Sequence, residues 1–450
     1  MFNPFKEKPN KIDCNFSDWQ GLCPKMYDKT KTDPYTKTRI ILMNGTEFEA
    51  CWFMHQFMRH CDNQDLRREL ALIRRNEQQQ QKRIAALKPI DENFLETTIA
   101  YEQLAIDLTA RLAKRAKDAN VKKALDFALL EDFDHLYRFS NLLKMDYDID
   151  SKDMLGGFTE ATVGRPTIAE HRYPYDDIKC FTNSKKADMF TKLTTHIITA
   201  AEQQTMNFYM NVANLYPNEL GRKLFSEIAM IEEQHVSQYG SLIDPSCTWL
   251  ENWLMHEYVE CYLYYSCYET ESNGYIKKIW AEHLKQEISH LHHVAKLLEK
   301  YEGKTYDQVL LSDGTFPEPL VLGENIEYVR NIIKASLTIT AFREDYKNII
   351  DMDDKAEYFC YQKTVNSDVD DVASHMVIQN FIDKFGEDYR VEARPHIITA
   401  LQDRTCDNTK IARHKKCDCG CVSMDSCVSI DGCCDSVKSQ TKKCSKCTKK

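Results

Sequence analysis

Glycine and proline are scarce in this 450-residue chain, which contains 14 glycines and 12 prolines. Both residues interrupt helices, so their scarcity favours long helices and an all-α fold. No run of sequence approaches the roughly 20 apolar residues of a membrane-spanning helix, and the N-terminus lacks the apolar core of a secretory signal. The 59 basic residues are outnumbered by 69 acidic ones, which gives no case for nucleic acid as the main partner. We therefore expect a cytoplasmic protein with neither a membrane nor a nucleic-acid partner.

Cysteine is unevenly distributed, because nine of the 18 cysteines lie in the last 45 residues. Residues 405–450 contain few large apolar side chains and cannot build a core of their own. The segment is similar to metallothionein segments, whose thiolates share soft ions such as Zn(II) or Cu(I). The alternative is an unstructured tail without a specific metal. The candidate ligands are Cys417, Cys419, Cys421, Cys433, Cys434, Cys444 and Cys447.

Three sets of two acidic residues and a histidine recur with one spacing. In each set the second acid follows the first by 30 residues, and the histidine follows it by 33. Such internal repetition is the first thing to look for in a chain of this length. The sets are Glu102, Asp132 and His135; Glu202, Glu232 and His235; and Glu257, Glu287 and His290.

The spacing fits a helical hairpin. A helix rises about 1.5 Å per residue, so about fourteen residues up, a short turn and fourteen down return the chain to its starting level. Turn-forming residues stand at the midpoint of each set, at 117–120, 216–218 and 272–274. The sequence therefore predicts hairpins over about 93–145, 187–241 and 249–302.

The acids and histidines fall on apolar helix faces. Leu95, Ile99, Glu102 and Ile106 share one stripe, and Asp132 and His135 lie on the stripe of the following helix. A buried carboxylate is costly unless it is paired, protonated or bound to a metal. An acid and an imidazole repeated at i, i+3 on such faces indicate metal ligation.

The first two hairpins resemble the ferritin-like superfamily, whose relatives include rubrerythrins, bacterioferritins and manganese catalases. The resemblance covers about 93–241 and implies a four-helix bundle with a long crossover, here 147–186. It implies two iron or manganese ions held by Glu102, Asp132, His135, Glu202, Glu232 and His235, and redox chemistry with dioxygen or peroxide. The chain departs from the pattern in carrying Asp132 where glutamate is expected, with Glu131 adjacent, so either could be the ligand; we favour Asp132 by register. It also lacks the paired Cys-x-x-Cys knuckles of a rubredoxin domain.

The third hairpin has no obvious partner. One hypothesis is that Glu257, Glu287 and His290, with Glu260 and His283 on the same faces, meet their copies across a two-fold axis, which predicts a homodimer. The alternative is that the second and third hairpins pair and the first is spare. The expected division is an N-terminal helical extension (1–90), a bundle of three hairpins (91–302), a helical region (303–404) and the cysteine-rich tail (405–450). The glutamine run 78–81 is interpreted as a solvated helix face.

Two functions from different classes follow. The first is an oxidoreductase acting on a small oxidant, with Tyr101, Tyr209 and Tyr239 as hydrogen-bond partners of the ligands. The second is a non-enzymatic metal-storage or stress protein in which the bundle and the tail both hold metal. A metal-free structural bundle is the third alternative.

Overall fold

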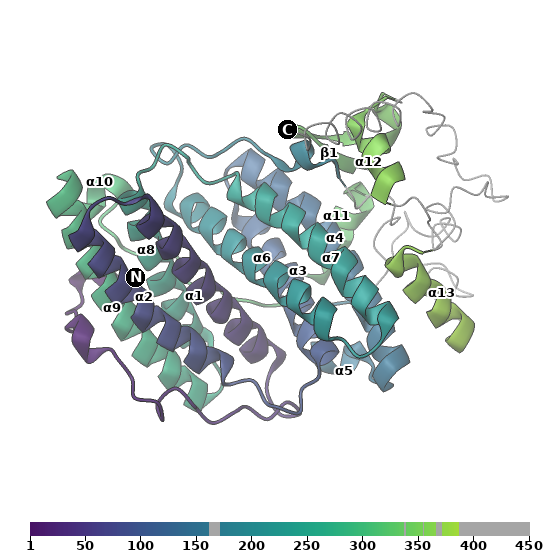
Figure 1. Cartoon of the computed structure of the whole chain (residues 1–450), viewed down its shortest axis with the longest axis horizontal. Helices are drawn as coiled ribbons and strands as arrows, with labels where there is room; N and C mark the ends of the chain where they lie inside the picture. The colour runs from purple at the N-terminus through teal and green to yellow at the C-terminus, as the bar shows by residue number, and fades with distance from the viewer. Residues whose placement is uncertain (162–171, 337–338, 354, 366–370, 387–450) are drawn as a thin grey trace, which may run out of the picture.

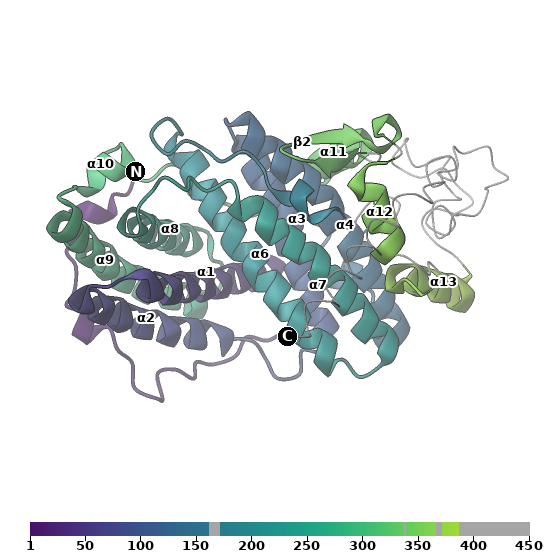
Figure 2. The ribbon, with the colours of Figure 1, turned by 45° about the horizontal axis from the view of Figure 1, so that its top comes forward.

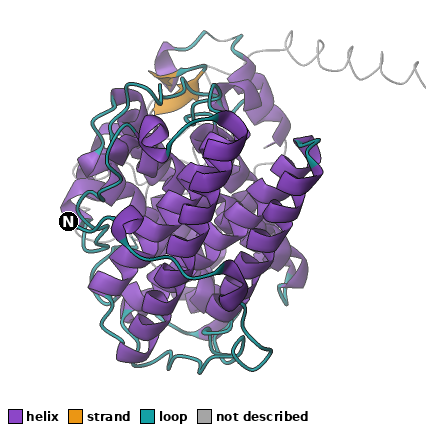
Figure 3. Cartoon of the chain, turned by 90° about the vertical axis from the view of Figure 1, so that its left-hand side faces the viewer, coloured by secondary structure: helices purple, strands orange, loops and turns teal. Residues whose placement is uncertain are grey.

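The computed structural model describes residues 1–161, 172–336, 339–353, 355–365 and 371–386. Within these residues the chain is mostly helical, which confirms the predicted all-α class. The only sheet of the described part is an antiparallel pair, β1 (Ile339–Phe342) and β2 (Asp345–Asn348), in which Thr340 faces Lys347. Long helices run side by side with loops at both ends (Figure 3).

Eight long helices make four hairpins, each with a turn of three residues. None of the described helices is long and apolar enough to cross a membrane. The hairpins are α1–α2 (Pro34–His60 and Gln64–Ala85), α3–α4 (Phe94–Arg115 and Ala119–Tyr147), α6–α7 (Met189–Leu215 and Glu219–Gly240) and α8–α9 (Trp249–Thr270 and Gly274–Glu302).

The hairpins pair into two four-helix bundles. In the first bundle α3 packs on α6 and α4 packs on α7. In the second bundle α1 packs on α8 and α2 packs on α9. The bundles lie side by side, joined by α1 against α3 and α6 (Figures 1 and 2). The first hairpin of the chain is therefore half of a bundle, where the sequence had suggested an N-terminal extension.

Each hairpin turn ends in an asparagine or aspartate that caps the next helix. The side chains of Asn63, Asp118, Asn218 and Asn273 accept hydrogen bonds from backbone N–H groups of the first helical turn. Capping of this kind fixes where a helix begins. The three turns predicted from the sequence are confirmed, and the fourth, at Asn63, has the same cap.

Shorter elements connect and flank the bundles. The crossover between α4 and α6 contains α5 (Ser151–Leu155) and the 3₁₀ turn η4 (Pro174–Asp177). After α9 come α10 (Tyr306–Leu310), α11 (Ile326–Ser336), the β hairpin, the 3₁₀ turn η5 (Ile349–Asp351), α12 (Glu357–Val365) and α13 (Ala373–Phe385). Helices α11 and α13 pack on the first bundle, and the N-terminal turns η1 (Pro4–Lys6) and η2 (Ile12–Cys14) pack on α9 of the second.

Candidate metal centres

The structure brings the six predicted ligands of the hairpins α3–α4 and α6–α7 together at mid-height of the first bundle. We call Glu102, Asp132, His135, Glu202, Glu232 and His235 the first cluster. All six are at most 1% exposed. One acid comes from each of α3 and α6, and one acid–histidine pair comes from each of α4 and α7, as the hairpin spacing predicts.

The first cluster divides into two groups that share one residue. Ligand atoms of Asp132, Glu202, Glu232 and His235 lie within 4.8 Å of one another, and so do those of Glu102, His135 and Glu232. The two oxygens of Glu232 face different histidines: Oε1 is 3.0 Å from Nδ1 of His135, and Oε2 is 3.1 Å from Nδ1 of His235. A carboxylate placed in this way can bridge two ions.

The orientation of His235 on α7 is fixed by a hydrogen bond on the side of its ring that faces away from the cluster. Nε2 of His235 lies 2.8 Å from Glu131 Oε2, which in turn accepts a 2.7 Å hydrogen bond from Arg172. Arg172, in the crossover, also donates from Nε to Asp177 at 2.8 Å. The Nε2 proton is therefore directed to Glu131, which leaves the lone pair of Nδ1 for a metal. Asp132 belongs to the cluster, while Glu131 stands one layer outside it, which agrees with the preference for Asp132.

Burial dominates the electrostatics of the first cluster. Burial raises the pKa of Glu102 and of Asp132 well above their usual values, and the charges of neighbouring carboxylates raise them further. Burial likewise raises the pKa of Glu202 to about 7. Burial favours neutral His235, but the hydrogen bond to Glu131 holds its pKa well above the usual value. Four carboxylates this close need protons or cations between them.

Several oxygens of the first cluster have no hydrogen-bond partner among the described residues. These are both oxygens of Asp132 and of Glu202 and one oxygen of Glu102. Buried polar atoms are almost always satisfied in native proteins, so unpaired ones indicate a place for a water molecule or an ion. The residues present therefore fit a pair of metal ions.

The three tyrosines proposed to support the ligands behave differently. Tyr209 donates to Glu102 Oε1 at 2.5 Å. Tyr101 instead accepts a hydrogen bond from Gln204, and the Tyr239 hydroxyl has no partner within the described residues. Only Tyr209 is bonded to a ligand carboxylate.

The third predicted set lies in the second bundle and is completed by the same chain. Glu257, Glu287 and His290 face Glu47 on α1 and Glu77 and Gln80 on α2. These three residues have the same offsets of 30 and 33. The expected contact with a second copy across a two-fold axis is thus not needed, and the alternative pairing of the hairpins at 187–241 and 249–302 is wrong.

The set Glu47, Glu77 and Gln80 was not predicted from the sequence, because glutamine stands in place of the histidine. The interpretation of residues 78–81 as a solvated face is wrong for Gln80, which is 2% exposed and donates to Glu287 Oε1 at 2.5 Å. Two signals could have found this hairpin. Its acids share the 30-residue spacing, and its capping residue Asn63 follows Glu47 by 16 residues, as each cap follows the first acid in the other hairpins.

We call Glu47, Glu77, Gln80, Glu257, Glu260, Glu287 and His290 the second cluster, all at most 2% exposed. His290 points Nδ1 at Glu287 (3.2 Å), while its Nε2 lies 2.7 Å from Asn76 Oδ1. Tyr264 donates to Glu47 as Tyr209 does to Glu102, each tyrosine standing seven residues after an acid of its own helix. His283, the other residue expected on this face, lies 3.0 Å from the Tyr264 hydroxyl.

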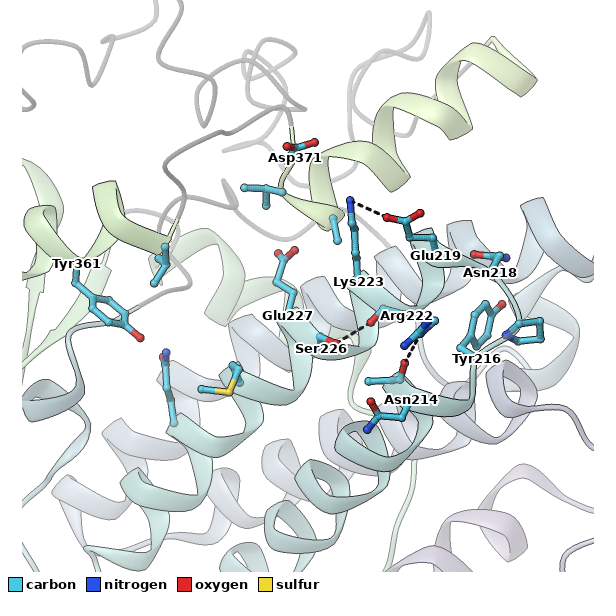
Figure 4. Close-up of a pocket in the computed structure, with 17 residues that line it drawn as sticks. Asn214, Tyr216, Asn218, Glu219, Arg222, Lys223, Ser226, Glu227, Tyr361 and Asp371 are labelled. Atoms are coloured by element: carbon cyan, nitrogen blue, oxygen red, sulfur yellow. Dashed lines mark hydrogen bonds and ion pairs between the residues drawn. The ribbon is translucent and has the colours of Figure 1, made fainter.

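Neither cluster lines the large open groove of about 930 Å³ beside α7 (Figure 4). That groove is bordered by Tyr216, Arg222, Lys223 and Glu227 and by residues near Asp371. The cysteine ligands proposed at positions 417–447 lie outside the described residues.

Comparison with protein-family models, with curated proteins and with solved structures finds no match. The assignment of function therefore depends on the geometry of the two clusters.

Proposed function

We propose that the chain is a ferritin-like dinuclear metal protein whose first cluster holds two iron or manganese ions. The observation that carries this proposal is Glu232, whose two oxygens face two histidines within two groups of potential ligands. Mixed carboxylate and imidazole ligation suits iron or manganese. We further propose that the chain is an oxidoreductase, with dioxygen or peroxide as its substrate.

The protein's own groups would prepare the cluster for this chemistry. Bound iron or manganese would supply the electrons that reduce the oxidant. The hydrogen bond from His235 Nε2 to Glu131 fixes the tautomer of the imidazole, and Tyr209 holds one oxygen of Glu102. Complete burial keeps bulk water from the carboxylates and strengthens their interaction with positive charge.

Metal analysis and turnover test the proposal. The full chain, purified anaerobically, loaded with iron or manganese and supplied with an external electron donor that re-reduces the metal, is expected to consume peroxide or dioxygen catalytically. Glu232→Ala should abolish turnover, because it removes the residue shared by both metal positions. Serine at the seven tail positions should leave turnover unchanged. Metal uptake without turnover would contradict the proposed oxidoreductase function and support metal storage.

Metal storage or buffering is the second candidate function. The observation that favours it is the cysteine cluster at positions 417–447, which adds soft thiolate donors, suited to Zn(II) or Cu(I), to a chain with buried carboxylates. Such a protein would bind metal stoichiometrically, and the tail substitutions would lower its capacity for soft ions.

A further inference from the structure

The second cluster differs from the first in the type of group at two positions that face its interior, while Glu77 in place of Asp132 changes only the length of a carboxylate side chain. Gln80 stands where the first cluster has His135, and Glu260 stands where the first cluster has Thr205, three residues after the acid of the same helix. The second cluster therefore offers five carboxylates, one amide and one imidazole, against four carboxylates and two imidazoles in the first.

The carboxylates of the second cluster lie close together, and few hydrogen-bond donors among the described residues offset their negative charge. Both oxygens of Glu77, Glu257 and Glu260 and one oxygen of Glu47 have no hydrogen-bond partner among the described residues. Ligand atoms of Glu77, Glu257, Glu287 and His290 lie within 4.8 Å of one another. Nδ1 of His290 is 3.8 Å from Glu257 and 3.9 Å from Glu77, so a cation between these groups would touch all three.

The supporting groups are those of a metal site. Nε2 of His290 donates a hydrogen bond to Oδ1 of Asn76. This bond directs Nδ1 of His290 toward the cluster, as the bond to Glu131 does for His235. Asn76 and Glu131 hold equivalent places, each immediately before the acid that begins the i, i+3 pair. Tyr264 and Gln80 supply two donors, to Glu47 and Glu287. These donors leave most of the carboxylate oxygens free for cations.

We propose that the second cluster is a separate metal centre for hard divalent cations of the Mn²⁺ type. Oxygen-rich ligand sets suit Mg²⁺, Ca²⁺ and Mn²⁺, and the single imidazole favours Mn²⁺ among them. The first cluster, with its second imidazole, is the better site for iron. One chain thus carries two centres that are built on the same hairpin frame and differ in ligand hardness.

Counting Mn²⁺ on the full-length apoprotein tests the proposal. Electron paramagnetic resonance of free Mn²⁺ during a titration gives the number bound, and thiolates of the tail compete poorly for so hard an ion. Glu287→Gln and Glu232→Gln are matched isosteric changes, one in each cluster. Each should remove about half of the bound Mn²⁺ and the double variant nearly all of it, since each bundle provides one dinuclear cage. Unchanged Mn²⁺ binding in Glu287→Gln would overturn the second centre.

A second variant distinguishes the loss of a metal ligand from a loss of folding. Gln80→His, in the Glu232→Gln background, gives the second cluster the imidazole that distinguishes the first. The ratio of Fe²⁺ to Mn²⁺ affinity, measured anaerobically, should rise by about tenfold. An unchanged ratio with helical content preserved in circular dichroism would show that Gln80 does not border a metal, and would overturn the proposed ligand set. Because the readout is affinity, this result is independent of any turnover at the first cluster.

Discussion

The two bundles share a frame and differ in the groups that fill it. In both bundles, acids at offsets of 30 residues lie together at mid-height, and a tyrosine donates a hydrogen bond to one carboxylate. In both, a hydrogen bond at Nε2 of a histidine directs its Nδ1 toward the cluster. The difference lies in charge and softness. The first cluster has two imidazoles and a charged outer layer of Glu131 and Arg172, whereas the second has one imidazole, a fifth carboxylate and the neutral Asn76. The backbone geometry thus sets where the buried acids and histidines meet, and a few side chains set the charge and the softness of each cluster.

Metal removal should have the largest effect. A ligand present at 1,000 times its Kd stabilises the folded state by about 4 kcal/mol per site, so stripping the two ions of a dinuclear cluster should lower the free energy of unfolding by about 8 kcal/mol for each cluster. Urea denaturation with and without Mn²⁺ measures this, and Glu232→Gln and Glu287→Gln should each lose about half of the effect. Equal stability of the stripped and loaded proteins would indicate a metal-free structural bundle.

Arg172→Met should be the most damaging single substitution outside the clusters. It removes the guanidinium that pairs with buried Glu131 and Asp177, and breaking a buried pair costs about 3–5 kcal/mol. Urea denaturation of the apoprotein measures the loss. The matched change in the second bundle, Asn76→Leu, removes a neutral group and should cost only about 1–3 kcal/mol. Equal losses of stability in the two variants would show that the charged pair of Glu131 and Arg172 stabilises the first bundle no more than the neutral Asn76 stabilises the second.

His135→Gln gives the first cluster the amide of the second. We expect its Fe²⁺ affinity to fall by about 100-fold, because one of two imidazoles is lost. Anaerobic Fe²⁺ titration measures the change, with His196→Gln on α6, buried but outside both clusters, as the control. An affinity within about twofold of the unmodified protein would contradict the role of His135 as a ligand.

Tyrosine-to-phenylalanine changes should have the smallest effects. Tyr209→Phe removes one hydrogen bond to Glu102 and should cost about 1 kcal/mol. Tyr264→Phe should cost more, because its hydroxyl contacts both Glu47 and His283. Thermal denaturation of the loaded proteins compares the two. A larger loss for Tyr209→Phe would mean that the His283 contact contributes little.

Local patterns in the sequence were sufficient for three hairpins and the first cluster. Asp132 and His135 share an apolar stripe with Leu129 and Leu136, so helical periodicity alone predicts that they point inward. The turn residues at Asp118, Asn218 and Asn273 mark the hairpin ends for a local reason, because their side chains cap the next helix.

The α1–α2 hairpin was not predicted because its features are weak at the level of sequence. Gln80 broke the histidine pattern, and its neighbours Gln78, Gln79 and Gln81 made the segment look solvated. Helix α1 is buried on several faces, between α2, α3, α6 and α8, so no single apolar stripe marks Glu47 as inward-facing.

The sequence by itself determined helical class, hairpin length and the inward face of most ligands, because these depend on residues three to thirty positions apart. Tertiary structure decided which hairpins pair. Glu47 and Glu257 are more than 200 residues apart, yet they meet because α1 and α8 bury their apolar faces against each other. The third set of ligands therefore finds its partner in the chain's own first hairpin, and that pairing turns an apparently incomplete set into a second candidate centre.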